Sequence, residues 1–397
     1  MLKKCRIIVL MKTNFHKLSF GFLFFFMLLH EACTYNHLPE SNKTIILNWY
    51  PAPAHQTKEE FTTGLVWMFS YLGAKLPANK FDDGVKFISS NKIEIDFEAL
   101  DFADFALNYL KILVSKIKQT EEYKVTGGID AGRFFALCFN SSYHYYKITG
   151  VAPSFIAFKN KFQEFVYNTF ACDTSAVAYS SRVLNYGIAS NSIANNFFFA
   201  QEGEGYFTQG NFIKSAVIEA FDYMENGQPR FAIYDEQGNL YAPNNPLKHP
   251  AGKPAKCMWC HESGMQPLIF PTTDIAGYET GASFTAARQI FTERLNEFHK
   301  STGSKLDFTQ KKAHSQGEII YLMFYEPDIT RLSQEWQMSE GNIKALLTGV
   351  PSHNNQEYPF LKEVYYRKDI EHLAPYKSIL VTDEMRESSA SEPNYLK

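Results

Sequence analysis

The chain has 397 residues, of which 45% are hydrophobic and 20% charged, and its formal net charge is −3. This length predicts about two domains of roughly 100–200 residues each. The composition is that of a globular protein, which excludes a disordered or low-complexity chain. Because there is no basic excess, we expect no nucleic-acid partner.

The N-terminus has the pattern of an export signal. Five basic residues precede an uninterrupted apolar run, Phe20–Leu29. They are Lys3, Lys4, Arg6, Lys12 and Lys17. A basic segment, a short apolar segment and a small residue at the cleavage point are typical of a secretory signal peptide. The run is about half as long as the roughly 20 residues that span a bilayer. We therefore predict that residues 1–32 are a removable signal peptide.

Cys33 follows this signal directly and suggests a lipid anchor. The segment Leu28–Cys33 (LLHEAC) resembles the end of a bacterial lipoprotein signal, although His30 and Glu31 depart from that pattern. The resemblance implies lipidation of Cys33 and attachment to a membrane face without a spanning helix. Ordinary cleavage nearby is the alternative. Either route predicts an extracytoplasmic protein, in the periplasm or on the outer-membrane face.

The segment after Cys33 is predicted to begin with a polar tether, residues 33–57, that contains Pro39, Pro51 and Pro53. From Lys58 the spacing of apolar residues becomes helical. Residues 58–215 are predicted to form a mostly helical N-terminal domain. Its expected helices are 58–72, 96–118, 130–139 and a fourth that begins near Pro153 and reaches Phe170.

A β meander is predicted within Ser215–Tyr241, because Asn226-Gly227 and Asp235–Asn239 are turn signals between apolar runs. Helices are then expected at 283–300, 309–325, 329–338 and 339–347. Together these form a second domain, residues 216–385, followed by a disordered tail, 386–397. The predicted fold class is α+β, mainly helical, with a small antiparallel β meander that precedes a loop carrying Cys257, Cys260 and His261.

One motif, Cys257-Met258-Trp259-Cys260-His261, points to specific chemistry. Two thiols at this spacing bond covalently to one edge of a haem, and the histidine that follows binds the iron. The 6 cysteines and 11 histidines of the chain would give roughly 0.0025 accidental matches. The motif also lies downstream of an export signal, where such haem attachment takes place.

Three other interpretations of this motif stay open. A dithiol redox centre normally follows a strand and opens a helix in a βαβ unit, but here a loop rich in proline precedes Cys257. A zinc site would use Cys257 and Cys260 with His261 or His249, but no second close pair of ligands is present. The third interpretation is a local Cys257–Cys260 disulfide. The haem interpretation is favoured over all three.

At these five residues the chain resembles bacterial c-type cytochromes. The resemblance implies one covalent haem c, held by Cys257 and Cys260 with His261 as the proximal iron ligand, and a role in electron transfer. The redox partner is not identified by the sequence. Small cytochromes c carry the motif near their N-terminus, whereas here it lies about two-thirds along a larger chain. The resemblance therefore does not extend to the usual cytochrome c fold.

The sixth iron ligand is not fixed by the sequence. Met338 is the first candidate for this distal position, because it lies at a predicted helix boundary. The other candidates are Met323, His249, His299, His314 and an open sixth site. Met265 is discounted because it follows His261 by only four residues.

The sequence thus predicts an exported, membrane-associated monohaem electron carrier rather than an enzyme. One alternative is a haem enzyme, peroxidase-like or an oxidase of small molecules, with an open sixth site. Another is a haem-free surface lipoprotein with a Cys257–Cys260 disulfide. Cys138 and Cys172 are read either as one further disulfide or as two buried thiols. No G-x-S-x-G, H-E-x-x-H or P-loop motif is present.

Overall fold

The computed structural model describes residues 42–51, 56–162, 167–173, 181–188, 192–204, 207, 213–241, 254–261, 274–308, 313–383, 385 and 392–397. The predicted signal peptide and the lipidation site Cys33 lie outside the described residues, as do His249 and Met265.

Groups of helices and groups of strands follow one another along this part of the chain. The helices are α2 (Lys58–Tyr71), α3 (Phe81–Gly84), α4 (Asp104–Lys118), α5 (Glu121–Thr126), α6 (Ala131–Phe139), α7 (Ser142–Thr149), α8 (Phe155–Asn160), α9 (Pro254–His261), α10 (Gly281–Ser301), α11 (Ala313–Tyr325), α12 (Ile329–Glu335), α13 (Glu340–Leu346) and α14 (Arg367–Ile370). The strands are β1 (Thr44–Asn48), β2 (Val85–Phe87), β3 (Lys92–Asp96), β4 (Ile129–Asp130), β5 (Asn168–Cys172), β6 (Arg182–Gly187), β7 (Phe197–Glu204), β8 (Ile213–Tyr223), β9 (Pro229–Tyr234), β10 (His353–Asn354) and β11 (Glu363–Val364).

The first sheet has the order β2-β3-β1-β4 and includes a strand that the sequence analysis took for tether. β1 pairs antiparallel with β3 and parallel with β4. Ile45 and Leu47 of β1 are fully buried in the core. The prediction of a tether through residue 57 is therefore wrong for residues 44–48. A strand this short has too few alternating positions for a clear period-2 signal.

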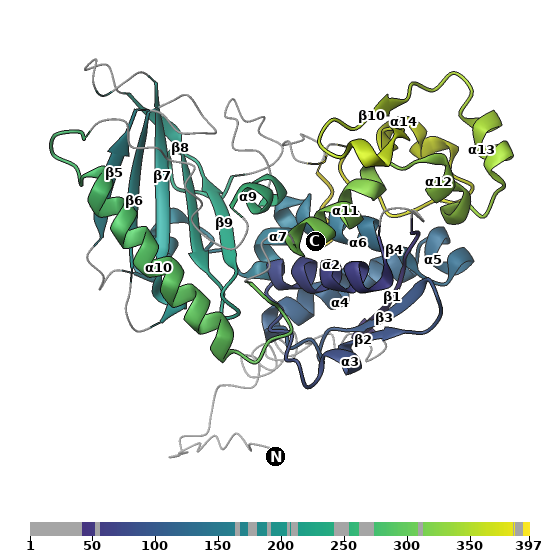
Figure 1. The fold of residues 1–397 in the computed structure, drawn as a ribbon, viewed down its shortest axis with the longest axis horizontal. Helices are drawn as coiled ribbons and strands as arrows, with labels where there is room; N and C mark the ends of the chain where they lie inside the picture. The colour runs from purple at the N-terminus through teal and green to yellow at the C-terminus, as the bar shows by residue number, and fades with distance from the viewer. Residues whose placement is uncertain are drawn as a thin grey trace, which may run out of the picture. The chain divides into compact units, whose positions relative to one another are not determined.

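Helix α11 packs closely against two helices that precede it by more than 170 residues (Figure 1). Gly64 of α2 and Gly132 of α6 make this approach possible. A Cβ atom on Gly64 would lie 2.7 Å from the Gln316 carbonyl oxygen, and one on Gly132 would lie 2.6 Å from that of Ile320. Any larger residue would push α11 away, so these glycines fix where the C-terminal part of the chain docks.

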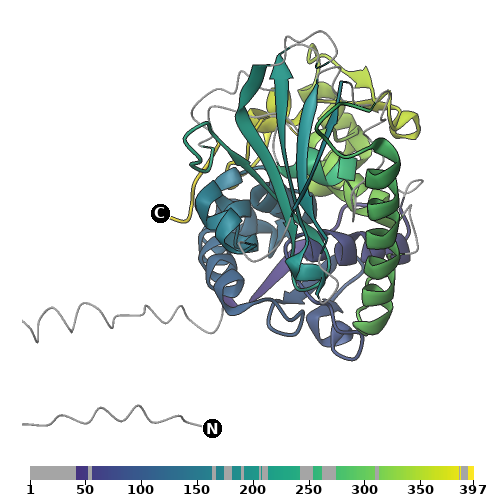
Figure 2. The same ribbon diagram turned by 90° about the vertical axis from the view of Figure 1, so that its left-hand side faces the viewer.

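The second sheet has five antiparallel strands in the order β5-β6-β7-β8-β9 and is covered on both faces. Helix α10 lies along one face (Figure 2). There its Phe284 contacts Phe170 and its Phe291 contacts Phe198. On the other face, Phe158 of α8 packs among side chains of β7 and β9. The residues of each strand therefore alternate between two apolar layers, and the sheet draws strands from both sides of residue 215.

This sheet corrects the predicted fold class. The described residues contain 13 helices and three sheets, with 45% helix and 19% strand, so the fold is mixed α/β and not mainly helical with a small meander. The aromatic run Phe155–Phe170, predicted as one helix, contributes α8 and then β5. The spacing of its phenylalanines does not distinguish a helix from a strand. Pairing with β6 makes the second half of the run a strand.

Residues near the C-terminus form hydrogen bonds with residues in the N-terminal half of the chain. The backbone N–H of Tyr395 donates to Nε2 of His144 at 2.9 Å, and the Ser141 hydroxyl donates to the Pro393 carbonyl at 2.8 Å. Residues 392–397, predicted to be a disordered tail, are thus hydrogen-bonded to α7. Within the ranges described above, no helix is both long and apolar enough to cross a membrane.

Candidate functional site

The predicted haem-attachment motif lies on the short helix α9, next to β9 (Figure 1). The prediction that a loop carries the motif is therefore wrong. Residues three and four apart lie on the same side of a helix. Cys257 and His261 are therefore placed on one side of α9, and Met258 and Trp259 on the other. Cys257 and His261 are half-buried. The side chain of Cys260 lies outside the described side chains.

The opposite side of α9 anchors the helix in the core. Met258 is fully buried. The Trp259 ring lies 6.3 Å from that of Tyr71 in α2 and 5.8 Å from that of Tyr321 in α11. The buried Nε1 of Trp259 has no hydrogen-bond partner in the described part of the chain. Met258 and Trp259, the two residues between the cysteines, therefore anchor α9 in the core.

His261 lies against the five-stranded sheet. Its ring centroid is 5.4 Å from that of Phe221 in β8 and 5.5 Å from that of Phe231 in β9. Both phenylalanines belong to the main core and are almost fully buried. The imidazole therefore has an apolar, aromatic neighbourhood on the side of the sheet, which is the kind of surface that a large planar group packs against.

Cys257 lies near two tyrosines of α7. Burial raises the pKa of Tyr146, and the Cys257 sulfur, when ionised, raises it further. The Tyr145 hydroxyl accepts a hydrogen bond of 3.2 Å from the backbone N–H of Phe231, so α7 is tied to the strand that contacts His261. Tyr146 also lines a cavity of about 300 Å³, together with Tyr143, Lys147, Leu240, Tyr241 and residues at the C-terminus.

These residues fit the requirements for attaching a haem. The two cysteines are one helical turn apart, and His261 lies on the same side of α9 as Cys257. The segments 242–253 and 262–273, which flank α9, lie outside the described residues.

The candidates for the sixth ligand are scattered. Met338 packs in a separate hydrophobic cluster with Leu332 and Trp336, away from the core that holds Met258. Met323 contributes to another cluster and lines a small cavity beside Asp130. His299 is buried in α10. The side chain of His314 is outside the described side chains. The structure brings none of the described candidates into a cluster with His261.

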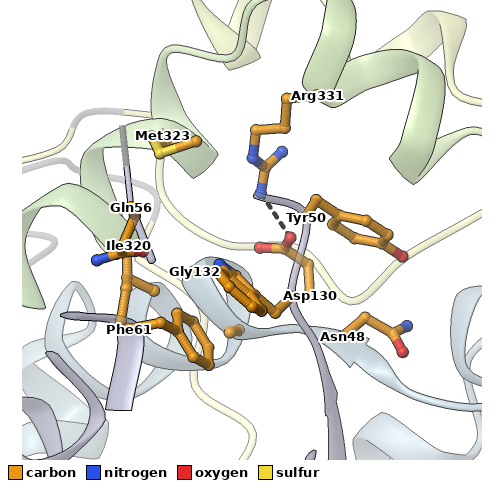
Figure 3. Close-up of a pocket in the computed structure, with 11 residues that line it drawn as sticks. Asn48, Tyr50, Gln56, Phe61, Asp130, Gly132, Ile320, Met323 and Arg331 are labelled. Carbon is orange, nitrogen blue, oxygen red and sulfur yellow. Dashed lines mark hydrogen bonds and ion pairs between the residues drawn. The ribbon is translucent and has the colours of Figure 1, made fainter. Parts of the chain in front are cut away.

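Sequence analysis missed a buried ionic cluster that joins α6 to the C-terminal helices. Oδ2 of Asp130 lies 2.5 Å from Nη2 of Arg331, and Nη1 of Arg331 lies 2.5 Å from Oε2 of Glu335. Arg367 donates to both carboxylate oxygens of Glu335 at 2.8 Å. Figure 3 shows the Asp130–Arg331 pair beside Tyr50. These four charged side chains are all at most 4% exposed.

Arg133 extends this cluster. Its Nε lies 3.2 Å from Oε2 of Glu122, and its Nη2 lies 2.8 Å from Oε1 of Glu371. The guanidinium groups of Arg133 and Arg367 both lie over the Phe324 ring, at 4.8 and 4.6 Å from its centroid. Cation–π contacts of this kind add to the ion pairs when the groups are desolvated. We use the term ionic cluster for Glu122, Asp130, Arg133, Arg331, Glu335, Arg367 and Glu371.

The carboxyls of the ionic cluster differ in their proton affinity. Burial raises the pKa of Asp130, and Arg331 only partly opposes this effect. Burial alone would also raise the pKa of Glu335, but Arg367 and Arg331 reverse the shift and hold it at about 2. The cavity beside Asp130 is only about 20 Å³, enough for roughly one water. We therefore interpret the ionic cluster as a structural feature that holds α12 and α14 against α6, and not as a substrate site.

The structure decides between the two interpretations of Cys138 and Cys172, a disulfide or two buried thiols. Cys138 and Cys172 are both buried free thiols, not a disulfide. Burial raises the pKa of each, to about 11 for Cys172. Neither is therefore a reactive thiolate at neutral pH.

In the described ranges no group of three or more histidine, cysteine, aspartate or glutamate side chains is arranged to hold a metal ion. Comparison with known proteins gave no match of any kind. No family model, no curated protein and no solved structure is similar to this chain.

Proposed function

We propose that this protein is an exported, membrane-associated carrier of one covalent haem c and that it transfers electrons. The observation that supports the proposal most strongly is the motif Cys257–His261, which lies on one anchored helix with Cys257 and His261 on the same side. Bound to these residues, the haem would supply a reversible one-electron couple at its iron.

The residues of the chain would hold and shield the group. Cys257 and Cys260 would form the two covalent bonds, and His261 would donate an imidazole nitrogen to the iron. Phe221 and Phe231 keep water away from one side of His261. Exclusion of water and a low local dielectric are two of the means by which a protein sets the potential of such a centre.

The test is a haem stain after denaturing electrophoresis. The full-length protein is expressed with its own signal and a c-type maturation system. We expect the wild-type band to stain and its intact mass to increase by one haem. The Cys257→Ala/Cys260→Ala variant should lose both signals completely. Cys138→Ala, which removes a thiol elsewhere, should keep them. An unstained wild-type band would contradict the proposal and would favour a dithiol, a disulfide or a metal at Cys257 and Cys260.

The membrane attachment that we propose depends on Cys33. Covalent lipid chains transfer a protein to a membrane without a spanning helix. We expect the wild-type protein in the membrane fraction, with incorporation of labelled fatty acid. The Cys33→Ser variant should lose the label and enter the soluble fraction. A wild-type protein without label would contradict lipidation but would leave the haem test unaffected.

A further inference from the structure

A second cavity, of about 330 Å³, lies where the β8–β9 hairpin meets α4, α7 and α8. Its volume is within the range of small-molecule sites. The motif residues of α9 are not among those that line it. Much of the cavity wall is apolar and comes from segments that are far apart in the sequence. The apolar lining residues include Leu72, Phe105, Ile148, Phe162 and Met224. Phe105 is 46% exposed, although the other four are buried.

The polar end of this cavity is built on Asp222, which is 3% exposed. Nε of Arg230 donates to Oδ1 of Asp222 at 2.7 Å, and Nη2 pairs with Oδ2. Nη1 of Arg230 donates to the carbonyls of Thr149 and Gly150 at 2.9 and 3.1 Å. The Arg230 guanidinium is therefore committed to these partners and holds the Asp222 carboxylate in place.

Lys161 lies at the rim of the same cavity. Its Nζ is 3.3 Å from Oδ2 of Asp222, and its side chain is 37% exposed. Burial lowers the pKa of Lys161, and Arg230 lowers it further, while Asp222 acts in the opposite direction. Since Asp222 is already paired with Arg230, the Lys161 ammonium group is not fully neutralised and would be stabilised by another anion.

Among the described residues that line the cavity, positive charges exceed negative charges by one. These residues include three cations, Lys75, Lys161 and Arg230, and two carboxylates, Asp222 and Glu225. Lys75 pairs with Glu225 at 2.9 Å, and Arg230 pairs with Asp222. The unmatched charge is therefore on Lys161, next to the apolar wall.

We propose that this cavity binds a small amphiphile with one carboxylate and an apolar chain or ring. The carboxylate pairs with Lys161, and the apolar part packs against Phe105, Ile148 and Met224. A single negative charge matches the excess on Lys161. A phosphate dianion would leave one charge unmatched, and a cationic head group would be repelled.

The cavity and α9 lie on opposite faces of the same two strands. Asp222 and Arg230 line the cavity, and their neighbours Phe221 and Phe231 contact His261 from the other face. Successive side chains of a strand point to opposite faces. The bound amphiphile would thus be separated from the His261 helix by one layer of sheet. The binding proposal does not depend on whether haem is attached.

Calorimetric titration of the full-length protein as purified with decanoate tests this inference. We expect decanoate to bind at one site, and decanol and decyltrimethylammonium to bind at least about tenfold more weakly, since a charged hydrogen bond contributes roughly 1.5–3 kcal/mol. Lys161→Gln should weaken decanoate about tenfold. The matched variant Lys159→Gln, which removes an exposed lysine two residues away, should stay within about twofold of wild type.

Two results would overturn the proposal. One is the absence of decanoate binding to the wild-type protein at millimolar concentration. The other is equal affinity for decanoate in the wild-type and Lys161→Gln proteins, which would show that the apolar chain alone binds. Ala194→Trp, at a half-buried position of the lining, provides a second variant. It should reduce decanoate binding by occupying the cavity, and unchanged binding would place the amphiphile elsewhere.

Discussion

The ionic cluster and the surroundings of α9 are both buried, but opposite chemistry holds them together. In the ionic cluster, Glu335 accepts from two guanidinium groups at distances of 2.5–2.8 Å. Around α9, rings of Phe221, Phe231 and Trp259 make contacts at 5.4–6.3 Å between centroids and in several orientations.

This difference affects how each region tolerates change. Ion pairs that are removed from water need every partner, because an isolated buried charge is very costly. Aromatic packing is less directional and adjusts to moderate changes of shape. The ionic cluster therefore fixes the position of α12 and α14 against α6. The aromatic surface around α9 is better suited to accept a large planar group.

The largest expected effect comes from removing the centre of the ionic cluster. Glu335→Ala leaves Arg367 and Arg331 buried without their shared carboxylate, and we expect it to lower the free energy of unfolding by about 3–5 kcal/mol. Denaturant unfolding of the purified protein measures this change. Glu340→Ala, at an exposed position of the next helix, should change it by less than about 0.5 kcal/mol. A loss below about 1 kcal/mol for Glu335→Ala would show that the pairs contribute little.

Acid should weaken the same region in a defined window. The folded-state pKa of Glu335 is about 2, below the ordinary value of 4.5. The stabilisation that Glu335 provides is therefore complete above about pH 4.5 and is lost as the pH falls through about 2. Linkage gives a contribution of about 3 kcal/mol. Unfolding measured across this window should show less dependence on pH in Glu335→Gln. An unchanged slope in this variant would contradict the assignment.

His144 is intermediate between the ionic cluster and the aromatic region, because it is a buried aromatic ring that can also take up a proton. Burial lowers its pKa from 6.5 to about 4. Its Nδ1 contacts the Leu137 carbonyl at 2.7 Å, and its Nε2 accepts from the Tyr395 N–H. Because the folded state binds this proton less tightly than the unfolded state, stability should fall as the pH drops below about 6.5.

At about pH 5 the loss attributable to His144 should be about 2 kcal/mol relative to neutral pH. Denaturant unfolding at the two pH values measures this loss, and His144→Gln should remove most of the pH dependence. His372→Gln, at an exposed position, serves as the control. If both variants keep the wild-type dependence, another group is responsible.

The smallest effect is expected in the aromatic region. Phe231→Leu keeps an apolar side chain next to Phe221 and His261, so we expect a loss of only about 1 kcal/mol. The same unfolding measurement applies. A loss as large as that of Glu335→Ala would mean that the aromatic surface is as intolerant of change as the ionic cluster, and would remove the distinction between the two regions.

Several helices could be predicted from the sequence, because their signals are local. The predicted helix from Lys58 is α2, whose start is fixed by hydrogen bonds between Thr57 and Glu60. Ser339 caps α13 at the predicted boundary, and the Asn226-Gly227 turn joins β8 to β9. By contrast, β1 and the extent of the five-stranded sheet were missed. Whether a short apolar segment becomes a strand depends on a partner elsewhere in the chain.

The sequence by itself determined the chemistry proposed for Cys257, Cys260 and His261, because two thiols at this spacing followed by a histidine form the pattern of covalent haem attachment. That the motif lies on a helix, α9, was not predicted. Only the tertiary structure decided that Asp130 meets Arg331 from 201 positions away, and that Lys161 pairs with Asp222 at the rim of a cavity. The physical reason is that contacts between distant residues depend on the docking of whole helices and sheets. No local pattern records that docking.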